Sequence, residues 1–109
     1  MAHIREIKFL VPVGNNCRRR HIHKRIKNEI IYFMIQLEVF IDNKWFPVVR
    51  YDTAHGFAHR DIIHYNGLVE KMVVLSHDYN EAIDIAESDL KTNWLIYKER
   101  FFKEVKNND

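Results

Sequence analysis

The hydrophobic pattern of this chain changes its period once, at Asp78. Before that residue, the segment 30–41 is rich in β-branched and aromatic residues, and within it residues 35–41 alternate apolar side chains with Gln36, Glu38 and Phe40, which is the period of a β-strand. After it, apolar residues recur every three or four positions, which is the period of an amphipathic helix. This single change predicts an α+β fold, in which an antiparallel meander sheet of four to five strands packs against one long C-terminal amphipathic helix.

Turn signals divide the first part of the chain into strands. Asp42-Asn43-Lys44 predicts a tight turn, and Asn66-Gly67 is the strongest hairpin signal because both of its residues tolerate positive φ. Pro47 indicates an edge position or a β-bulge, because proline donates no ladder hydrogen bond. We expect strands at residues 30–41, 45–51, 58–65 and 68–75, in a sheet region that covers 30–75, with 3–13 as the fifth strand.

A long helix is predicted over residues 78–105. Asp78 is a suitable N-cap, and Glu81 three residues later resembles the acidic member of a capping box. A helix of this length spans about 40 Å, roughly the size of a compact domain of this length. One apolar stripe follows the helical period: Tyr79, Ala82, Ile83, Ala86, Leu90, Trp94, Tyr97, Phe101 and Val105.

The length of this helix allows two interpretations. The helix bends near Thr92-Asn93, where helix propensity is weaker, or its end packs on another subunit. Leu95, Ile96 and Phe102 lie off the main stripe and favour the second interpretation. We therefore expect a homodimer.

The composition indicates one folded domain over residues 1–109. Hydrophobic residues make up 47% of the chain and charged residues 29%, which excludes a disordered polar chain and a membrane protein. The single cysteine, Cys17, excludes an intramolecular disulfide and, with no recognisable secretory leader, favours a cytoplasmic location. Large aromatic residues are expected in the core or an interface rather than as stacking platforms: Trp45, Phe46, Trp94, Phe101 and Phe102.

Basic charge is concentrated in an N-terminal strand or arm, residues 1–29. Residues 1–30 contain eight Lys or Arg against two Glu, a local charge of +6, whereas the other 79 residues carry −4. We expect the basic run to form a short helix or an ordered loop. Such a run can contact nucleic acid, or it can be a solvated or partly disordered arm that binds an acidic partner. The candidate nucleic-acid-binding residues, which can pair with phosphates, are Arg18, Arg19, Arg20, Lys24 and Arg25.

Residues 50–64 contain three His, two Asp and two Arg, more than a surface turn requires. Functional sites concentrate in loops that a rigid sheet supports. The register that pairs Asp52 with His59 also pairs Arg50 with Asp61, whereas the neighbouring register places two arginines together. We prefer the first register, which puts these four side chains on one face with His55 in the loop above them.

This face has the groups that a metal-independent ribonuclease needs. His55 or His59 can serve as the base for the 2′-hydroxyl and as the acid for the 5′-oxygen. Asp52 or Asp61 can orient a histidine, and Arg50 or Arg60 can stabilise the charge of the phosphorane. The catalytic candidates are His55, His59, Arg50, Asp52 and Asp61, with RNA as the substrate and no cofactor.

Two other interpretations of these residues stay open. His55, His59 and Asp61 resemble the two histidines and one carboxylate that hold Fe(II) or another divalent ion. Alternatively, an Arg–Asp ion pair and the histidines close a strand end and serve the strand register alone. In that case the protein is a non-catalytic module that binds nucleic acid or another protein.

The letters RYDTAHG at residues 50–56, followed by HRD at 59–61, form a distinctive core. With its amphipathic C-terminal helix, the chain resembles over residues 34–104 a family of small uncharacterised prokaryotic domains. The same core is less closely similar to toxins of the TumE type, which are members of toxin–antitoxin pairs. This second resemblance implies RNA cleavage or inhibition of translation.

Overall fold

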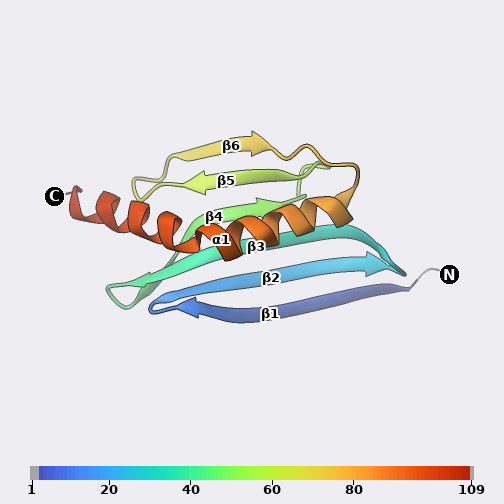
Figure 1. Cartoon of the computed structure of the whole chain (residues 1–109), viewed down its shortest axis with the longest axis horizontal. Coiled ribbons are helices and arrows are strands. Elements are labelled where there is room, and N and C mark those ends of the chain that lie inside the picture. The colour runs from blue at the N-terminus through green and yellow to red at the C-terminus, as the bar shows by residue number, and fades with distance from the viewer. Residues whose placement is uncertain (1–2, 109) are drawn as a thin grey trace.

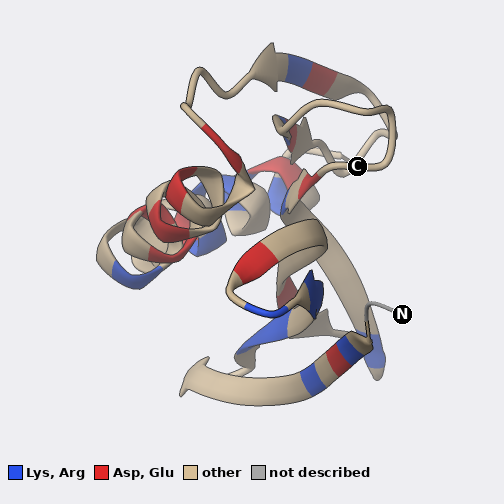
Figure 2. Cartoon of the chain, turned by 90° about the vertical axis from the view of Figure 1, so that its right-hand side faces the viewer, with Lys and Arg blue, Asp and Glu red and all other residues tan. Residues whose placement is uncertain are grey.

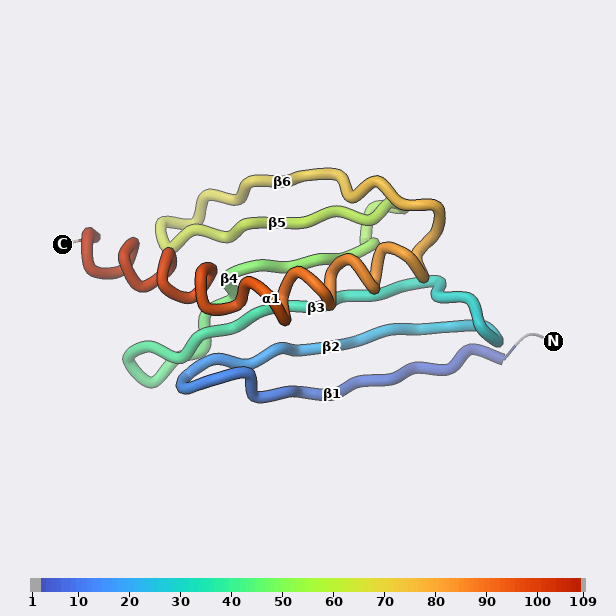
Figure 3. Tube along the Cα trace, viewed as in Figure 1, coloured from blue at the N-terminus to red at the C-terminus, as the bar shows by residue number. Residues whose placement is uncertain are grey.

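The computed structural model describes residues 3–108, which form a six-stranded antiparallel sheet and one helix (Figure 1). Each strand pairs with the next one along the chain, so the predicted α+β meander with a C-terminal helix is confirmed (Figure 3). Residues 1, 2 and 109, which the predicted domain includes, lie outside the described residues. The elements are β1 (Ile4–Gly14), β2 (Cys17–Ile26), β3 (Glu29–Ile41), β4 (Lys44–Asp52), β5 (His59–Ile63), β6 (Val69–Val73) and α1 (Tyr79–Lys106).

The basic segment forms strand β2, so the prediction of a short helix or an ordered loop was wrong. For this reason the sheet has six strands rather than four or five. β2 lies between β1 and β3, and its alternate residues face opposite sides of the sheet. Cys17 is buried in the core, whereas its neighbour Arg18 forms an ion pair with Glu38 of β3. Part of the positive charge of this strand is offset by Glu38, which lies opposite Arg18 on β3 and forms ion pairs with both Arg18 and Arg20.

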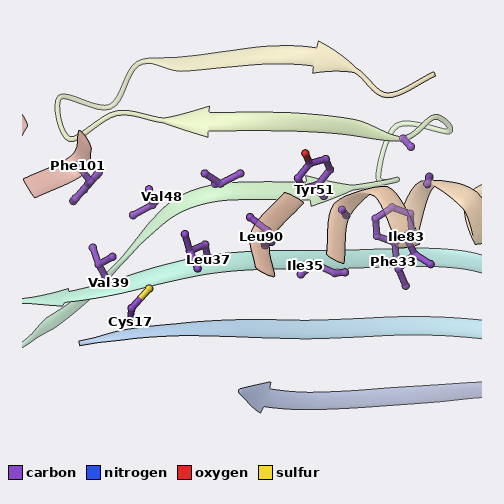
Figure 4. Close-up of a cluster of buried hydrophobic side chains, with 14 residues drawn as sticks. Cys17, Phe33, Ile35, Leu37, Val39, Val48, Tyr51, Ile83, Leu90 and Phe101 are labelled. Carbon is purple, nitrogen blue, oxygen red and sulfur yellow. The ribbon is translucent and has the colours of Figure 1, made fainter. Parts of the chain in front are cut away.

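The helix α1 covers one face of the sheet. Its N-cap is Asp78, as predicted, and the carboxylate of Asp78 accepts a hydrogen bond from the backbone N–H of Glu81 at 2.9 Å. We call the side that α1 covers the helix-covered face and the other side the open face. The predicted apolar stripe packs over β3 and β4 (Figure 4), and its buried members are Ala82, Ile83, Ala86, Leu90 and Phe101.

The length of α1 requires no bend in this fold. The described residues extend over 54 × 25 × 22 Å, and α1 runs along the longest direction (Figure 1). The comparison of the helix with the size of a compact domain assumed a spherical shape. In this elongated fold the 13 residues of β3 span about 43 Å, which matches the length of about 42 Å for α1. Leu95 and Ile96 are 48% and 65% exposed within one chain, and the homodimer stays a prediction.

The structure has both predicted turns between strands, but one of the two connections is longer than a tight turn. Asp42 and Asn43 have φ values of 51° and 63°, which make the predicted tight turn between β3 and β4. The register of these strands shifts next to Pro47, which is the bulge that the proline predicts. The β5–β6 connection is longer than a two-residue turn, because the carbonyl of Leu68 accepts the N–H of His64. The described part of the chain has no helix with the length and apolar character of a membrane span.

Candidate active site

The predicted register between β4 and β5 is confirmed. Asp52 lies opposite His59, and Arg50 lies opposite Asp61. The intervening Tyr51 lies on the helix-covered face, where its hydroxyl donates a hydrogen bond to a carboxylate of α1. Because strand residues alternate between faces, the four predicted side chains share the open face.

Three of these side chains form a buried cluster, which we call the Asp–His–Asp cluster (Asp52, His59 and Asp61). The Nε2 atom of His59 lies 3.0 Å from Oδ1 of Asp52 and 3.7 Å from Oδ2 of Asp61. The exposed fractions of the three residues are only 8%, 3% and 4% in sequence order. The imidazole of His59 is therefore held in place from one side by two carboxylates.

The Asp–His–Asp cluster also has the composition of a metal site. Each of its three residues offers one ligand atom, and these atoms lie within 4.8 Å of one another. One imidazole with two carboxylates suits a divalent transition metal. Asp52 thus takes the place that the sequence analysis gave to His55.

A lysine already occupies part of this ligand set. The Nζ atom of Lys71 on β6 lies 3.2 Å and 3.4 Å from the two carboxylate oxygens of Asp61. Oδ1 of Asp52 accepts the backbone N–H of Ala54 as well as facing His59. An ammonium group repels a metal cation at the same carboxylate. These contacts favour a charge-paired cluster over a metal centre.

A small pocket of about 120 Å³ opens beside the cluster. His55 is exposed at this pocket, and its ring lies 5.7 Å from the ring of buried His59 at an angle of 27°. The ring of Phe57, which is 46% exposed, lies 5.5 Å from that of His59. The Nδ1 atom of His59 is buried and has no hydrogen-bond partner among the described residues. The pocket is lined by His55, Phe57, His59, Lys71, Met72 and Val73.

The loop that carries His55 is shaped by its own backbone. The Asp52 carboxylate accepts the N–H of Ala54 at 3.0 Å, which is an Asx-turn. The N–H of Gly56 donates to the carbonyl of Thr53 at 3.1 Å, and Gly56 has a φ of +85° that glycine adopts without strain. Asp52 therefore contributes both to holding His59 and to presenting His55.

Arg50 lies on the predicted face but belongs to a second group of side chains. Its Nε atom donates to Oε1 of Gln36 at 2.7 Å, and Nε2 of Gln36 donates to Glu38 at 2.6 Å. Glu38 also accepts hydrogen bonds from the Nε atoms of Arg18, at 2.6 Å, and Arg20, at 2.9 Å. We call these five residues the arginine cluster.

Comparison with known proteins assigns the chain to a family. The family model described as "Domain of unknown function (DUF7718)" matches residues 4–107. This chain belongs to the DUF7718 family. The match covers every strand and the whole of α1, which bears out the resemblance to an uncharacterised domain family. No curated protein and no solved structure matches the chain.

The five predicted nucleic-acid-binding residues of the DUF7718 domain do not form one surface. Arg18, Arg20 and Lys24 lie on the open face, whereas Arg19 and Arg25 lie on the helix-covered face. Arg19 is only 7% exposed. Acidic segments also lie beside basic ones on the strands (Figure 2). The basic run of the sequence is thus divided by the two-residue period of the strand.

Electrostatics at the arginine cluster of the DUF7718 domain stabilise its ionised state. Burial raises the pKa of Glu38, but hydrogen bonds from Arg20, Arg18 and Gln36 outweigh this effect and lower the pKa. The hydrogen bond to Glu38 in turn raises the pKa of Arg20. Glu38 therefore remains a carboxylate in spite of an exposed fraction of 4%.

Sequence reasoning missed Lys71 and Glu38 as site residues of the DUF7718 domain. Lys71 lies directly opposite Asp61, and Glu38 lies directly opposite Arg18. The signal that could have found them is cross-strand charge pairing. It requires a known register for β2 and β6, which the sequence analysis did not have.

Proposed function

We propose that the DUF7718 domain is a metal-independent ribonuclease that acts on RNA at the His55 pocket. The observation that carries the proposal is the exposed imidazole of His55, stacked beside an imidazole that two carboxylates hold in place. General acid–base catalysis requires a proton-transfer group that the substrate can reach and that the protein holds in position, and an exposed imidazole beside a fixed imidazole suits this role. Lys71 adds a positive charge at the same pocket.

In the proposed reaction, His55 accepts the proton of a 2′-hydroxyl. The 2′-oxygen then forms a bond to the adjacent phosphorus, and the bond from phosphorus to the 5′-oxygen breaks. The leaving 5′-oxygen takes a proton from a water molecule, and the hydroxide that remains takes the proton held by His55. The products are a 2′,3′-cyclic phosphate and a 5′-hydroxyl, and His55 is neutral again. The ammonium of Lys71 stabilises the additional negative charge of the phosphorane.

The other predicted catalytic residues have different parts in this proposal. His59 is 3% exposed, so it positions His55 rather than touching the substrate. Asp52 and Asp61 hold His59. Arg50 lies in the arginine cluster and contacts the substrate outside the reacting phosphate.

The weaker resemblance of the RYDTAHG core to TumE-type toxins supports the same reaction class. A toxin of this kind is paired with an antitoxin, which would be the protein partner of this chain. Such a pair acts in the cytoplasm, where its RNA substrates are found.

A second candidate function is a module that binds nucleic acid or protein without catalysis. The burial of Asp52, His59 and Asp61 and the ion pair from Lys71 favour it, because a buried and paired network can serve the fold alone. This candidate predicts RNA binding without cleavage.

The test is incubation of a mixed RNA with the purified protein, with and without EDTA. Wild-type protein is expected to cleave in EDTA, and His55→Ala is expected to lower the rate by about 100-fold or more, as loss of a general base does. His77→Ala, which removes another exposed histidine, is the matched control and should cleave like wild type. Cleavage products should end in a 2′,3′-cyclic phosphate.

Variants of His59 test its positioning role. We expect His59→Ala to abolish most cleavage and His59→Gln to change the pH profile of the residual activity, with circular dichroism confirming the fold. Full activity of His59→Ala would contradict the proposal. EDTA-sensitive cleavage that Asp52→Asn removes would instead establish a metal centre at the Asp–His–Asp cluster. Salt-dependent RNA binding with no cleavage would establish the binding module.

A further inference from the structure

We infer that the arginine cluster on the open face binds the phosphate backbone of single-stranded RNA, and that Trp45 and Phe40 beside it stack on the bases. The choice of RNA as the ligand rests on the proposed function. The site itself rests on the register, hydrogen bonds and exposure of the open-face side chains.

The strand register brings three arginines together. Gln36 of β3 lies directly between Arg20 of β2 and Arg50 of β4, and Arg18 lies opposite Glu38. Adjacent strands are about 4.8 Å apart, so the three guanidinium groups lie over neighbouring strands within reach of one segment of nucleic acid. Three positive charges against the single carboxylate of Glu38 leave a local charge of +2.

The hydrogen bonds of the cluster leave the terminal nitrogens of two of its three arginines free, whereas Nη2 of Arg20 donates to Glu38. Arg18 and Arg50 use Nε to bond Glu38 and Gln36. Their terminal nitrogens make no hydrogen bond to a described residue, and they are not among the buried unpartnered atoms. Arginine binds phosphate through these terminal nitrogens. Glu38 and Gln36 therefore hold the guanidinium groups in position before a ligand binds, which reduces the entropy lost on binding.

Aromatic side chains lie at one end of the cluster. The guanidinium of Arg18 lies 3.8 Å from the ring centre of Trp45, and the rings of Trp45 and Phe40 are 5.1 Å apart. Both aromatic residues are half-buried on the open face, so Trp45 lies outside the hydrophobic core, and its expected place in an interface stays a prediction. Proteins that bind single strands combine a basic track with aromatic rings on which unpaired bases stack.

The cluster is also next to the proposed active site. Arg50 lies directly opposite Asp61, and Asp61 contacts both His59 and Lys71. A strand bound along the cluster therefore passes from Trp45 across Arg50 towards the His55 pocket. Unpaired bases are needed for stacking on Trp45, which selects single-stranded RNA over a duplex.

The test is binding of a fluorescent 2′-O-methyl RNA of about 12 nucleotides, a length within the range of single-strand sites, measured by anisotropy. The methyl group blocks cleavage through the 2′-oxygen, so binding and catalysis are measured separately. The variant Arg18→Ala/Arg50→Ala should bind about tenfold more weakly. The slope of its log affinity against log salt concentration should become shallower by the amount expected for about two lost phosphate contacts. The matched control is Arg5→Ala/Lys8→Ala, which removes the same charge from exposed positions of β1 and should change the affinity less than twofold.

Glu38→Gln separates positioning from net charge. This variant gains one positive charge, so an effect of net charge alone would tighten binding. We expect it to bind several-fold more weakly, because two arginines lose the carboxylate that holds them. Tighter binding would overturn the positioning role of Glu38, and the double arginine variant stays a valid test if Glu38→Gln does not fold.

Trp45→Leu tests the stacking role. Stacking releases no counterions, so this variant should weaken binding without changing the slope of affinity against salt.

The two double variants together decide whether the site exists. Equal losses of affinity in Arg18→Ala/Arg50→Ala and in the control Arg5→Ala/Lys8→Ala, or no loss in either, would overturn the site. Binding at the cluster without cleavage by wild type would refute the ribonuclease alone, whereas cleavage with unaffected binding by Arg18→Ala/Arg50→Ala would refute the cluster alone.

Discussion

The two faces of the sheet are built from alternate residues of the same strands, yet they have different chemistry. Along β3, Ile35 and Leu37 are fully buried beneath α1, whereas Gln36 and Glu38 form hydrogen bonds on the open face. The helix-covered face excludes water and gains stability from apolar burial. The open face arranges charged groups in pairs and leaves some of their atoms free. Stability is thus concentrated on one face, and candidate function on the other.

The largest expected effect is on the helix-covered face. Leu90 of α1 is completely buried, so Leu90→Ala should lower the free energy of unfolding by about 2–5 kcal/mol. Arg50→Ala on the open face should lower it by less than about 1 kcal/mol, because partly exposed polar contacts contribute little. Urea unfolding of both variants measures this difference. Equal losses would break the division between a stabilising and a functional face.

The next effect concerns a buried histidine on the helix-covered side. Burial, followed by the charges of His23 and Arg19, lowers the pKa of His21 to about 4. As the pH falls below 6.5, the unfolded chain takes up this proton before the folded chain does, so the free energy of unfolding decreases down to about pH 4. From this shift in pKa we expect His21 to account for a decrease of about 3 kcal/mol in the free energy of unfolding.

Substitution of this histidine sharpens the comparison between the faces. His21→Phe keeps a ring beside Phe9, on which His21 stacks at 4.3 Å, and removes the titrating group. Thermal unfolding between pH 4 and 7 should therefore become less dependent on pH in this variant. An unchanged pH dependence would show that the loss of stability in acid comes from other groups.

The smallest expected effect lies at the border of the helix-covered face. Hydrogen bonds to Glu70 and Glu104 raise the pKa of His64, so this group stabilises the folded state fully below about pH 6.5 and loses its effect as the pH rises through the raised pKa. The ion pairs are partly exposed, so their contribution should be less than about 1 kcal/mol. Glu104→Gln should reduce the change in melting temperature between pH 6 and 8. A larger change in this variant would contradict the assignment.

The local patterns of the sequence predicted much of the fold. The capping residue Asp78, the apolar stripe of α1 and the turn at Asp42-Asn43 all depend on neighbouring residues, and the structure confirms them. The basic segment was misassigned because its ladder to β3 and the ion pairs of Arg18 and Arg20 with Glu38 join it to residues that are far away in the sequence. Propensity gives no information about such partners.

The sequence analysis predicted the part of the candidate site for which it also predicted the strand register, namely the pairing of β4 with β5. The pairing of Asp52 with His59 followed from charge complementarity across β4 and β5, and the structure has it. A two-residue turn at Asn66-Gly67 would have placed Met72 opposite Asp61, whereas the longer connection places Lys71 there. A shift of one residue moves a side chain to the other face of the sheet, which is why Lys71 was missed.

The sequence by itself determined the class of the fold and the residues that could carry chemistry, because period and residue type are local properties of a chain. Only the tertiary structure decided which of those residues act together. It divided the basic run between two faces, buried His59 and left His55 exposed, and placed the Arg50 side chain in a hydrogen bond with Gln36 of β3. These assignments depend on strand order, register and helix placement, which arise from contacts between residues far apart in the chain.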